Sequence, residues 1–143
     1  MTELKYVAKA LVLNSRGEVL ILRRSSTDSA RPHDWDLPGG GIDPGEEPGQ
    51  AVLREIAEEV SISLTADAIR LIGKETTQYG EPRNHVVLRF LYSARVDDNT
   101  TVSLSYEHDQ FEWLPLEAAL ERIKHLVWGE LALRARAQDV LQS

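Results

Sequence analysis

The fold is decided by residues 40–62, which read GGIDPGEEPGQAVLREIAEEVSI. Within this stretch, Glu55, Glu58 and Glu59 have the i, i+3, i+4 spacing that places side chains on one face of a helix. Carboxylates held so close repel one another, and a chain that keeps them together usually has a cation to place there. The first hypothesis is therefore a divalent-metal site.

A helix is expected from about Pro48 to Val60. Proline is favoured in the first turn of a helix, where a missing N–H costs nothing. The i, i+3, i+4, i+7 spacing of a buried stripe is met by Leu53, Ile56, Ala57 and Val60. At about 100° per residue, the three glutamates should lie on the side opposite this stripe.

The segments around this helix alternate in the manner of strands. The expected strands are residues 6–14, 18–24, 68–78, 85–96 and 111–114, with a short apolar piece at 35–37. The first two should form a hairpin, and residues 25–34 a loop. A helix is expected from residue 116 to the end of the chain, with a break near Trp128 and Gly129. The pattern indicates an α+β fold with a mixed sheet, in one domain of residues 1–143.

Composition limits the class of protein and of ligand. The chain has 143 residues, 42% of them hydrophobic and 27% charged, which is typical of a soluble globular domain. No cysteine is present, so any metal must bind oxygen or imidazole. There is no secretory leader and no run of about 18 to 20 apolar residues, so a cytoplasmic protein without a membrane span is expected. The net charge of −7 argues against a nucleic-acid polymer as partner, but not against a small nucleotide.

The residue types in this stretch suit magnesium chemistry. Magnesium takes oxygen ligands and is held by one or two carboxylates together with substrate phosphate. Arg54 lies four residues before Glu58 and is able to orient that acid by a salt bridge. Glycines at residues 39–41 let the backbone approach closely, so that a carbonyl oxygen could point at a metal.

These spacings resemble the Nudix box: Gly, five residues, Glu, seven residues, Arg-Glu, an apolar residue, any residue, Glu-Glu, any residue, Gly and an apolar residue. The matching positions here are Gly40, Glu46, Arg54, Glu55, Ile56, Glu58, Glu59 and Ile62. Ser61 stands where the family usually has a glycine that ends the helix in a left-handed conformation. Serine there costs about 1 kcal/mol but removes no metal-binding group.

The resemblance covers nearly the whole chain, because WDLPGGG at residues 35–41 and EHDQFEWLPLEAA at residues 107–119 also look like the family. It implies a Nudix fold, in which a mixed sheet is sandwiched between helices. It also implies a hydrolase that uses Mg²⁺ or Mn²⁺ to cleave the pyrophosphate bond of a nucleoside diphosphate linked to another group. That substrate could be a nucleoside triphosphate, a dinucleoside polyphosphate or a nucleotide sugar, and a monomer or homodimer is expected.

The resemblance also implies roles for single residues. Glu58 and Glu59 match the main metal ligands, Glu55 a ligand or water-orienting acid, and Arg54 the residue that orients it. Glu46 matches the structural or secondary metal acid of the box, and the Gly39 carbonyl oxygen matches a backbone metal ligand. Glu107 matches a loop glutamate that acts as metal ligand or general base, with Glu112 as its rival.

Four side chains outside the box are candidates for substrate contact: Arg23, Arg24, Trp35 and Tyr79. The arginines could bind phosphate or be ordinary surface charge. Trp35 could stack on a base or belong to the core. A tyrosine in the region of Tyr79 resembles a mark of diadenosine polyphosphate hydrolases, whereas His85 and His108 are expected to be ordinary histidines.

Two alternatives belong to other functional classes. One is a non-catalytic Nudix module that binds a nucleotide and regulates or partners another protein. The other is an acidic-helix domain without a ligand, since a row of glutamates on a helix is commonly just a solvated face.

Overall fold

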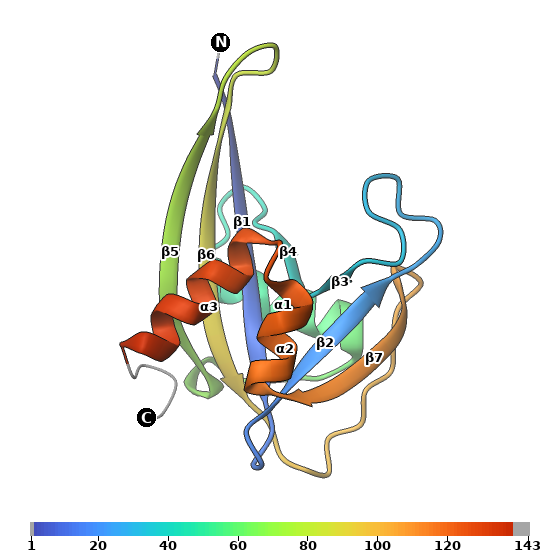
Figure 1. The fold of residues 1–143 in the computed structure, drawn as a ribbon. Coiled ribbons are helices and arrows are strands. Elements are labelled where there is room, and N and C mark those ends of the chain that lie inside the picture. The colour runs from blue at the N-terminus through green and yellow to red at the C-terminus, as the bar shows by residue number, and fades with distance from the viewer. Residues whose placement is uncertain (1, 139–143) are drawn as a thin grey trace.

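The computed structural model describes residues 2–138, which form seven strands, three α-helices and one 3₁₀ turn (Figure 1). The strands are β1 (Glu3–Leu13), β2 (Glu18–Arg24), β3 (Trp35–Asp36), β4 (Gly39–Gly41), β5 (Ile69–Tyr79), β6 (His85–Arg95) and β7 (His108–Pro115). The helices are α1 (Pro48–Val60), η1 (Ala66–Ala68), α2 (Leu116–Ile123) and α3 (Val127–Ala137). None of the helices in this part of the chain is long and apolar enough to cross a membrane.

One mixed sheet organises these elements in the order β3-β2-β1-β6-β5, with β4 paired to β1 and β7 paired to β2. The longest pairing is parallel, between β1 and β6, and runs from Glu3 opposite His85 to Leu13 opposite Arg95. The predicted hairpin of β1 and β2 exists only next to its turn, where Leu13 lies opposite Val19. Beyond that point β2 leaves β1 and pairs with β7, and β4 takes the vacated edge of β1.

Helices cover both faces of the sheet, with α1 behind it and α2 and α3 in front in Figure 1. Alternate residues of β1 serve the two faces, as expected for a strand whose side chains point to opposite sides. Ala10 and Val12 pack with Ile56 of α1, whereas Leu11 and Leu13 pack in the cluster that α2 and α3 cover. The expected α+β architecture with a sheet between helices is therefore confirmed.

Two expectations about the helices need correction. Helix α1 has its predicted bounds, but its buried residues are Ala51, Val52, Ile56, Glu59 and Val60. Ala57 is exposed, so the buried stripe is rotated from the predicted one and includes a glutamate. The break between α2 and α3 comes at residues 124–126, before Gly129. Gly129 lies inside α3, where a Cβ atom would come within 2.4 Å of the Ile123 carbonyl oxygen, so this glycine permits close packing. The predicted helical structure at residues 139–143 lies outside the described residues.

Candidate metal and phosphate site

Glu59 is the most buried acid of the predicted metal set, with 4% of its surface exposed. The prediction that it lies opposite the buried side of α1 was wrong, because α1 packs onto β4, whose glycines leave room for the carboxylate. Glu59 Oε1 accepts a hydrogen bond from the Gly39 N–H at 2.9 Å. Burial raises the pKa of Glu59 to about 8, against the smaller opposing effects of this hydrogen bond and of the Lys9 charge.

Glu55 lies against Gly40 in the same region. A Cβ atom at residue 40 would come within 2.8 Å of the Glu55 carboxylate, so the contact requires a glycine. Gly39 has a φ of +140°, and a Cβ there would lie 2.3 Å from the Ala8 carbonyl oxygen. Burial raises the pKa of Glu55. The two glycines thus let α1 bring the partly buried Glu55 carboxylate and the buried Glu59 carboxylate against the backbone of β4.

Arg54 orients the acids around it. Its guanidinium donates to both Glu46 oxygens, at 2.8 and 3.0 Å, and to Glu55 at 3.1 Å. It also reaches both oxygens of Glu58 at 3.3 Å and the Gly41 carbonyl oxygen at 3.0 Å. The predicted orienting contact of Arg54 is thus present in the structure and extends to three acids.

The Glu46 carboxylate is occupied by hydrogen bonds from Arg54 and from a backbone N–H. Besides the Arg54 fork, it accepts a hydrogen bond from the Asp43 N–H at 2.9 Å. The Arg54 hydrogen bonds, together with that backbone bond, lower the pKa of Glu46 to about 2. Its carboxylate therefore anchors Arg54 in this structure, and its binding of a metal stays a prediction.

A pocket of about 230 Å³ collects four of the six predicted metal-binding residues, and we call it the carboxylate pocket. Its lining is Lys9, Arg24, Asp28, Gly39, Gly40, Gly41, Glu55, Glu59, Glu107 and His108. The carboxylates of the lining come from α1, from the 25–34 loop and from the 96–107 loop, whereas the cations come from β1 and β2. Glu58 is not in this lining, and its side chain is 55% exposed.

The 96–107 loop reaches the pocket because it is bonded to the end of α1. Ser103 N–H donates to the Val60 carbonyl oxygen and Ser105 N–H to the Glu59 carbonyl oxygen, each at 3.0 Å. The Glu107 carbonyl oxygen accepts from Ser25 N–H at 3.0 Å, which ties the loop to the end of β2. Its rival Glu112 pairs with Arg122 at 2.8 Å and does not line the pocket. The geometry therefore favours Glu107.

Two charged residues of this region were not singled out from the sequence, Lys9 and Asp36. Both are buried, and Lys9 Nζ lies 3.1 Å from Asp36 Oδ2. Asp36 also binds Arg24 and Arg31, at 3.0 and 2.5 Å. A signal existed, since Lys9 shares its face of the predicted strand with Val7 and Leu11, and Asp36 stands inside a short apolar piece between Trp35 and Leu37.

His108, which the sequence led us to expect as an ordinary histidine, also lines this pocket. Its Nδ1 is buried and has no hydrogen-bond partner among the described residues. Burial lowers the pKa of His108 to about 4, and the charge of Lys9 lowers it further. His108 therefore contributes a neutral imidazole to the lining of the carboxylate pocket.

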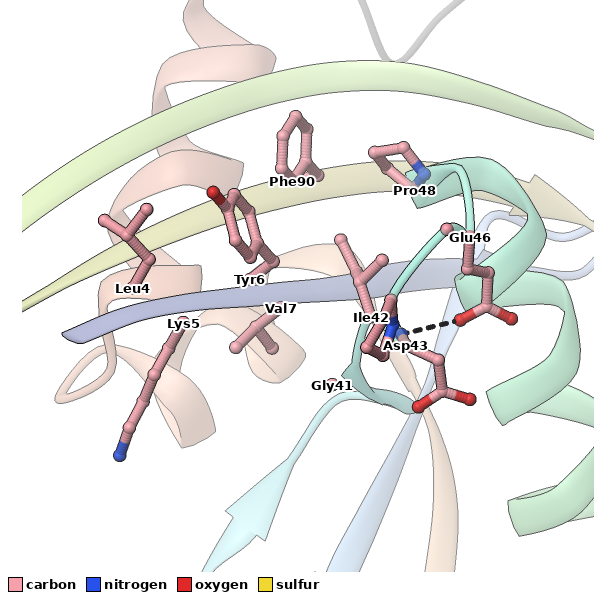
Figure 2. Close-up of a pocket in the computed structure, with 12 residues that line it drawn as sticks. Leu4, Lys5, Tyr6, Val7, Gly41, Ile42, Asp43, Glu46, Pro48 and Phe90 are labelled. Atoms are coloured by element: carbon pink, nitrogen blue, oxygen red, sulfur yellow. Dashed lines mark hydrogen bonds between the residues drawn. The ribbon is translucent and has the colours of Figure 1, made fainter.

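A larger apolar cleft of about 750 Å³ adjoins the carboxylate pocket (Figure 2). Its lining is Leu4, Lys5, Tyr6, Val7, Gly41, Ile42, Asp43, Pro44, Gly45, Glu46, Pro48 and Phe90. Figure 2 shows the rings of Tyr6 and Phe90 on one side of β1 and β6, facing Ile42 and Pro48. Gly41 lines both the cleft and the carboxylate pocket, so the two hollows share a wall.

Three of the four predicted substrate contacts lie outside both hollows. Arg23 binds both oxygens of Asp109, at 2.8 and 3.0 Å. Trp35 packs against the core cluster under α2 and α3, with the Arg122 guanidinium 4.8 Å from its ring centre. The fourth, Arg24, lines the carboxylate pocket.

Tyr79 lies on the other face of the sheet from the apolar cleft. It stacks on His85 with ring centres 4.7 Å apart, and its hydroxyl accepts a hydrogen bond from Arg89 at 3.1 Å. Arg89 precedes Phe90 in β6, and consecutive strand residues point to opposite faces. Substrate contact by Tyr79, Arg23 and Trp35 stays a prediction that this arrangement does not favour.

The donor set of the carboxylate pocket fits a hard divalent cation. The acids of the pocket offer carboxylate oxygens as ligand atoms, and Mg²⁺ and Mn²⁺ prefer oxygen ligands. The charges of Glu55 and Glu107 raise the pKa of Glu59, so mutual repulsion persists there despite Lys9. Within residues 2–138, no three carboxylates or imidazoles already converge on one point. Glu58 in particular points toward Arg54, so a bound ion would require a change of its rotamer.

Comparison with known proteins identifies the class. The family model described as NUDIX domain matches residues 4–133. The chain belongs to the Nudix family. The asymmetrical bis(5'-nucleosyl)-tetraphosphatase of Caenorhabditis elegans is 33% identical over 103 residues, which cover 70% of this chain and 72% of that protein. The 8-oxo-dGTP diphosphatase of Escherichia coli (strain K12) is 37% identical over 84 residues, 59% of this chain and 61% of the other.

Solved structures agree with the Nudix assignment. The MutT protein from Methanosarcina mazei Go1 superposes with a TM-score of 0.76 at 26% identity, and the match covers 96% of each chain. The expected enzyme class, a Nudix pyrophosphohydrolase, is thereby confirmed, as is the expected fold. Nudix hydrolases generally use divalent metals, in agreement with the oxygen-rich donor set.

Proposed function

We propose that this Nudix hydrolase binds Mg²⁺ or Mn²⁺ in the carboxylate pocket and cleaves the pyrophosphate bond of a nucleotide whose base lies in the apolar cleft. One observation carries the proposal: Glu55, Glu59 and Glu107 share a pocket that adjoins a cleft with two aromatic walls. The pairing of an acidic pocket with an apolar cleft matches a ligand with a charged end and an aromatic end.

The acids of the pocket would hold the metal in this proposal. The ligands are Glu55 and Glu59, with Glu58 and the Gly39 carbonyl oxygen as further ligands. When bound, the ion neutralises charge on the pyrophosphate and acidifies a bound water. Arg54 keeps Glu55 and Glu58 oriented through its hydrogen bonds at 3.1 and 3.3 Å. Glu107 either joins these ligands or acts as the general base, the two roles that its place in the family pattern implies.

The apolar cleft is the proposed site of the base. Tyr6 and Phe90 are carried by neighbouring strands and present ring faces on which a base would stack. The polar side chains of the cleft are few, and Glu46 is already bound to Arg54. Stacking without many hydrogen bonds to the base edge implies tolerance of different bases. Nucleoside triphosphates, dinucleoside polyphosphates and nucleotide sugars are all candidate substrates.

The proposal is tested with a panel of these three substrate classes. Each substrate is assayed with Mg²⁺ and with Mn²⁺, and the products are identified by mass spectrometry. Release of a nucleotide by cleavage between two phosphates is expected with at least one class. Tight nucleotide binding without hydrolysis under either ion would favour the non-catalytic module. If divalent ions neither bind nor stabilise the protein, the acidic helix has no ligand and the proposed metal site is wrong. The proposal concerns one domain in the cytoplasm, as a monomer or homodimer.

A further inference from the structure

Lys9 is buried in the middle of β1, with 8% of its surface exposed. Its ammonium donates to the Leu37 carbonyl oxygen at 3.2 Å and lies 3.1 Å from Asp36 Oδ2. Removing a charge from water carries a large free-energy cost, which a salt bridge offsets only with good geometry and further hydrogen bonds. A buried lysine in a strand therefore requires an explanation.

Asp36 has other partners besides Lys9. Asp36 is fully buried, and the Arg24 and Arg31 guanidinium groups already lie 3.0 and 2.5 Å from its Oδ2 atom. Its Oδ1 atom accepts a hydrogen bond from the Leu37 N–H at 2.7 Å. The carboxylate thus has two cations and a backbone donor without Lys9. Arg24 and Arg31 in turn pair with Asp28 and Asp34, so the cluster holds three cations and three carboxylates. What Lys9 retains for a further anion is therefore an N–H donor and not an excess of charge.

The place of Lys9 indicates where that anion would lie. An ammonium group has three N–H donors, and the two acceptors found here, Asp36 and Leu37, leave one of them. Two cations, Lys9 and Arg24, line the carboxylate pocket together with four acids, Asp28, Glu55, Glu59 and Glu107. The charge of Lys9 lowers the pKa of Glu59, which places it within electrostatic reach of the proposed metal ligands. A pocket lined by both acids and cations suits a phosphate group bridged to a metal.

We propose that Lys9 binds a phosphate oxygen of the substrate from the sheet side of the carboxylate pocket, opposite the acids of α1. The proposal rests on the proposed function. In it, Asp36 and the Leu37 carbonyl oxygen fix the direction of the ammonium, and Arg24 lies beside it as a second cation. The ligand is identified by its chemistry, as the phosphoryl group that the metal does not fully neutralise.

Substituting Lys9→Met tests this contact, since methionine keeps much of the side-chain length without the charge. The expected result is an increase of about 10-fold in KM for the nucleotide that the wild type cleaves, with a smaller change in kcat. Affinity for inorganic pyrophosphate, measured by calorimetry without divalent ions, should fall by a similar factor. Lys124→Met is the matched control, because it removes the same charge from an exposed site just after α2. It should change neither value.

A purely structural role for Lys9 predicts a different pattern, which a double-mutant cycle with Asp36→Asn reveals. Asparagine removes the charge of Asp36 but keeps an acceptor for the ammonium. If Lys9 binds phosphate, Lys9→Met raises KM about 10-fold in the Asp36→Asn background as well. If Lys9 only neutralises Asp36, its substitution has no effect on KM in that background, and the proposal is overturned. The double variant also serves where Lys9→Met alone does not fold.

The two proposals fail in different ways. A wild-type protein that cleaves no nucleotide with Mg²⁺ or Mn²⁺ contradicts the proposed function. A wild-type protein that cleaves a nucleotide, while Lys9→Met keeps the wild-type KM and pyrophosphate affinity, contradicts only the role of Lys9.

Discussion

Ser61 Oγ donates a hydrogen bond to the Ser103 carbonyl oxygen at 3.0 Å, and this bond joins the end of α1 to the loop that carries Glu107. Ser61 has a φ of 62°, in the left-handed region that its family usually fills with glycine. The single departure from the Nudix box therefore contributes a contact that glycine could not make. The hydroxyl offsets part of the strain that the side chain introduces.

Substitutions of Ser61 should separate these two effects. Ser61→Ala keeps the left-handed strain and loses the hydrogen bond, so the free energy of unfolding should fall by about 1 kcal/mol. Ser61→Gly also loses the bond but relieves about 1 kcal/mol of strain, so its stability should stay close to that of the wild type. Urea unfolding curves of the three proteins measure both differences. A glycine variant as unstable as the alanine variant would show that strain at this position is negligible.

Removing the charge of Glu58 or Glu59 should abolish most turnover. Glu58→Gln and Glu59→Gln are each expected to lower kcat by at least about 100-fold, because an amide is a poorer ligand for a divalent cation than a carboxylate. Steady-state kinetics measure the loss, and circular dichroism checks that the fold persists. Glu121→Gln, on an exposed part of α2, is the charge-matched control and should leave kcat unchanged. Near-normal turnover in the two variants would remove these residues from the metal site.

Gly40→Ala should disturb the site through sterics alone. The added methyl would lie 2.8 Å from the Glu55 carboxylate, so that side chain must move. We expect kcat to fall at least about 10-fold while the protein remains folded, since a misplaced ligand group carries a cost of that order. Gly80→Ala is the control, because no atom lies within 4 Å of a Cβ at that turn. Equal kcat values for the Gly40 variant and the wild type would mean that the position of Glu55 is not critical.

The buried Glu59 should make metal-free stability depend on pH. Its folded pKa, raised by burial from 4.5 to about 8, means that the folded state holds a proton that the unfolded state has already released between these values. The free energy of unfolding should therefore fall as pH rises through this window. Thermal unfolding in a chelating buffer would show the slope, and Glu59→Gln should flatten it.

The same thermal unfolding experiment is then repeated with divalent ions present. Binding to the folded state alone raises stability by mass action, and it requires the ionised carboxylate. Saturating Mg²⁺ or Mn²⁺ should therefore raise the melting temperature most near pH 8, where the metal-free protein is weakest. A melting temperature that depends on pH identically in the wild type and in Glu59→Gln would assign the dependence to other groups.

The sequence predicted the local structure of the site well, because its signals are local. Helix α1 follows from Pro48 and its apolar spacing, and its bounds are as expected. The break before α3 was misplaced because Gly129 packs against Ile123 inside the helix region, which no local pattern reveals. The parallel pairing of β1 with β6 was also not predicted, since strand partners far apart in the chain leave no local signal.

The buried charges of the site were the hardest part to predict. The burial of Glu59 depends on the glycines of β4, which allow α1 to approach the sheet closely. The role of Lys9 depends on Asp36, and these two residues meet only because β3 leads into β4, which pairs with β1. Charge pairs of this kind are set by tertiary packing, whereas the Nudix box records residues of one local segment, 40–62.

The long parallel pairing of β1 with β6 also fixes the position of two proposed contacts along β1. Tyr6 in the apolar cleft and Lys9 at the carboxylate pocket are three residues apart on β1, which at about 3.3 Å per residue separates them by about 10 Å along the strand. Their odd separation directs the two side chains to opposite faces of β1, and the strand fixes where the proposed base and phosphate contacts lie along its length. A slip of β1 by one residue against β6 would turn the side chains of both Tyr6 and Lys9 to the other face of the sheet. The register of this one strand pair therefore determines both substrate choice and phosphate binding.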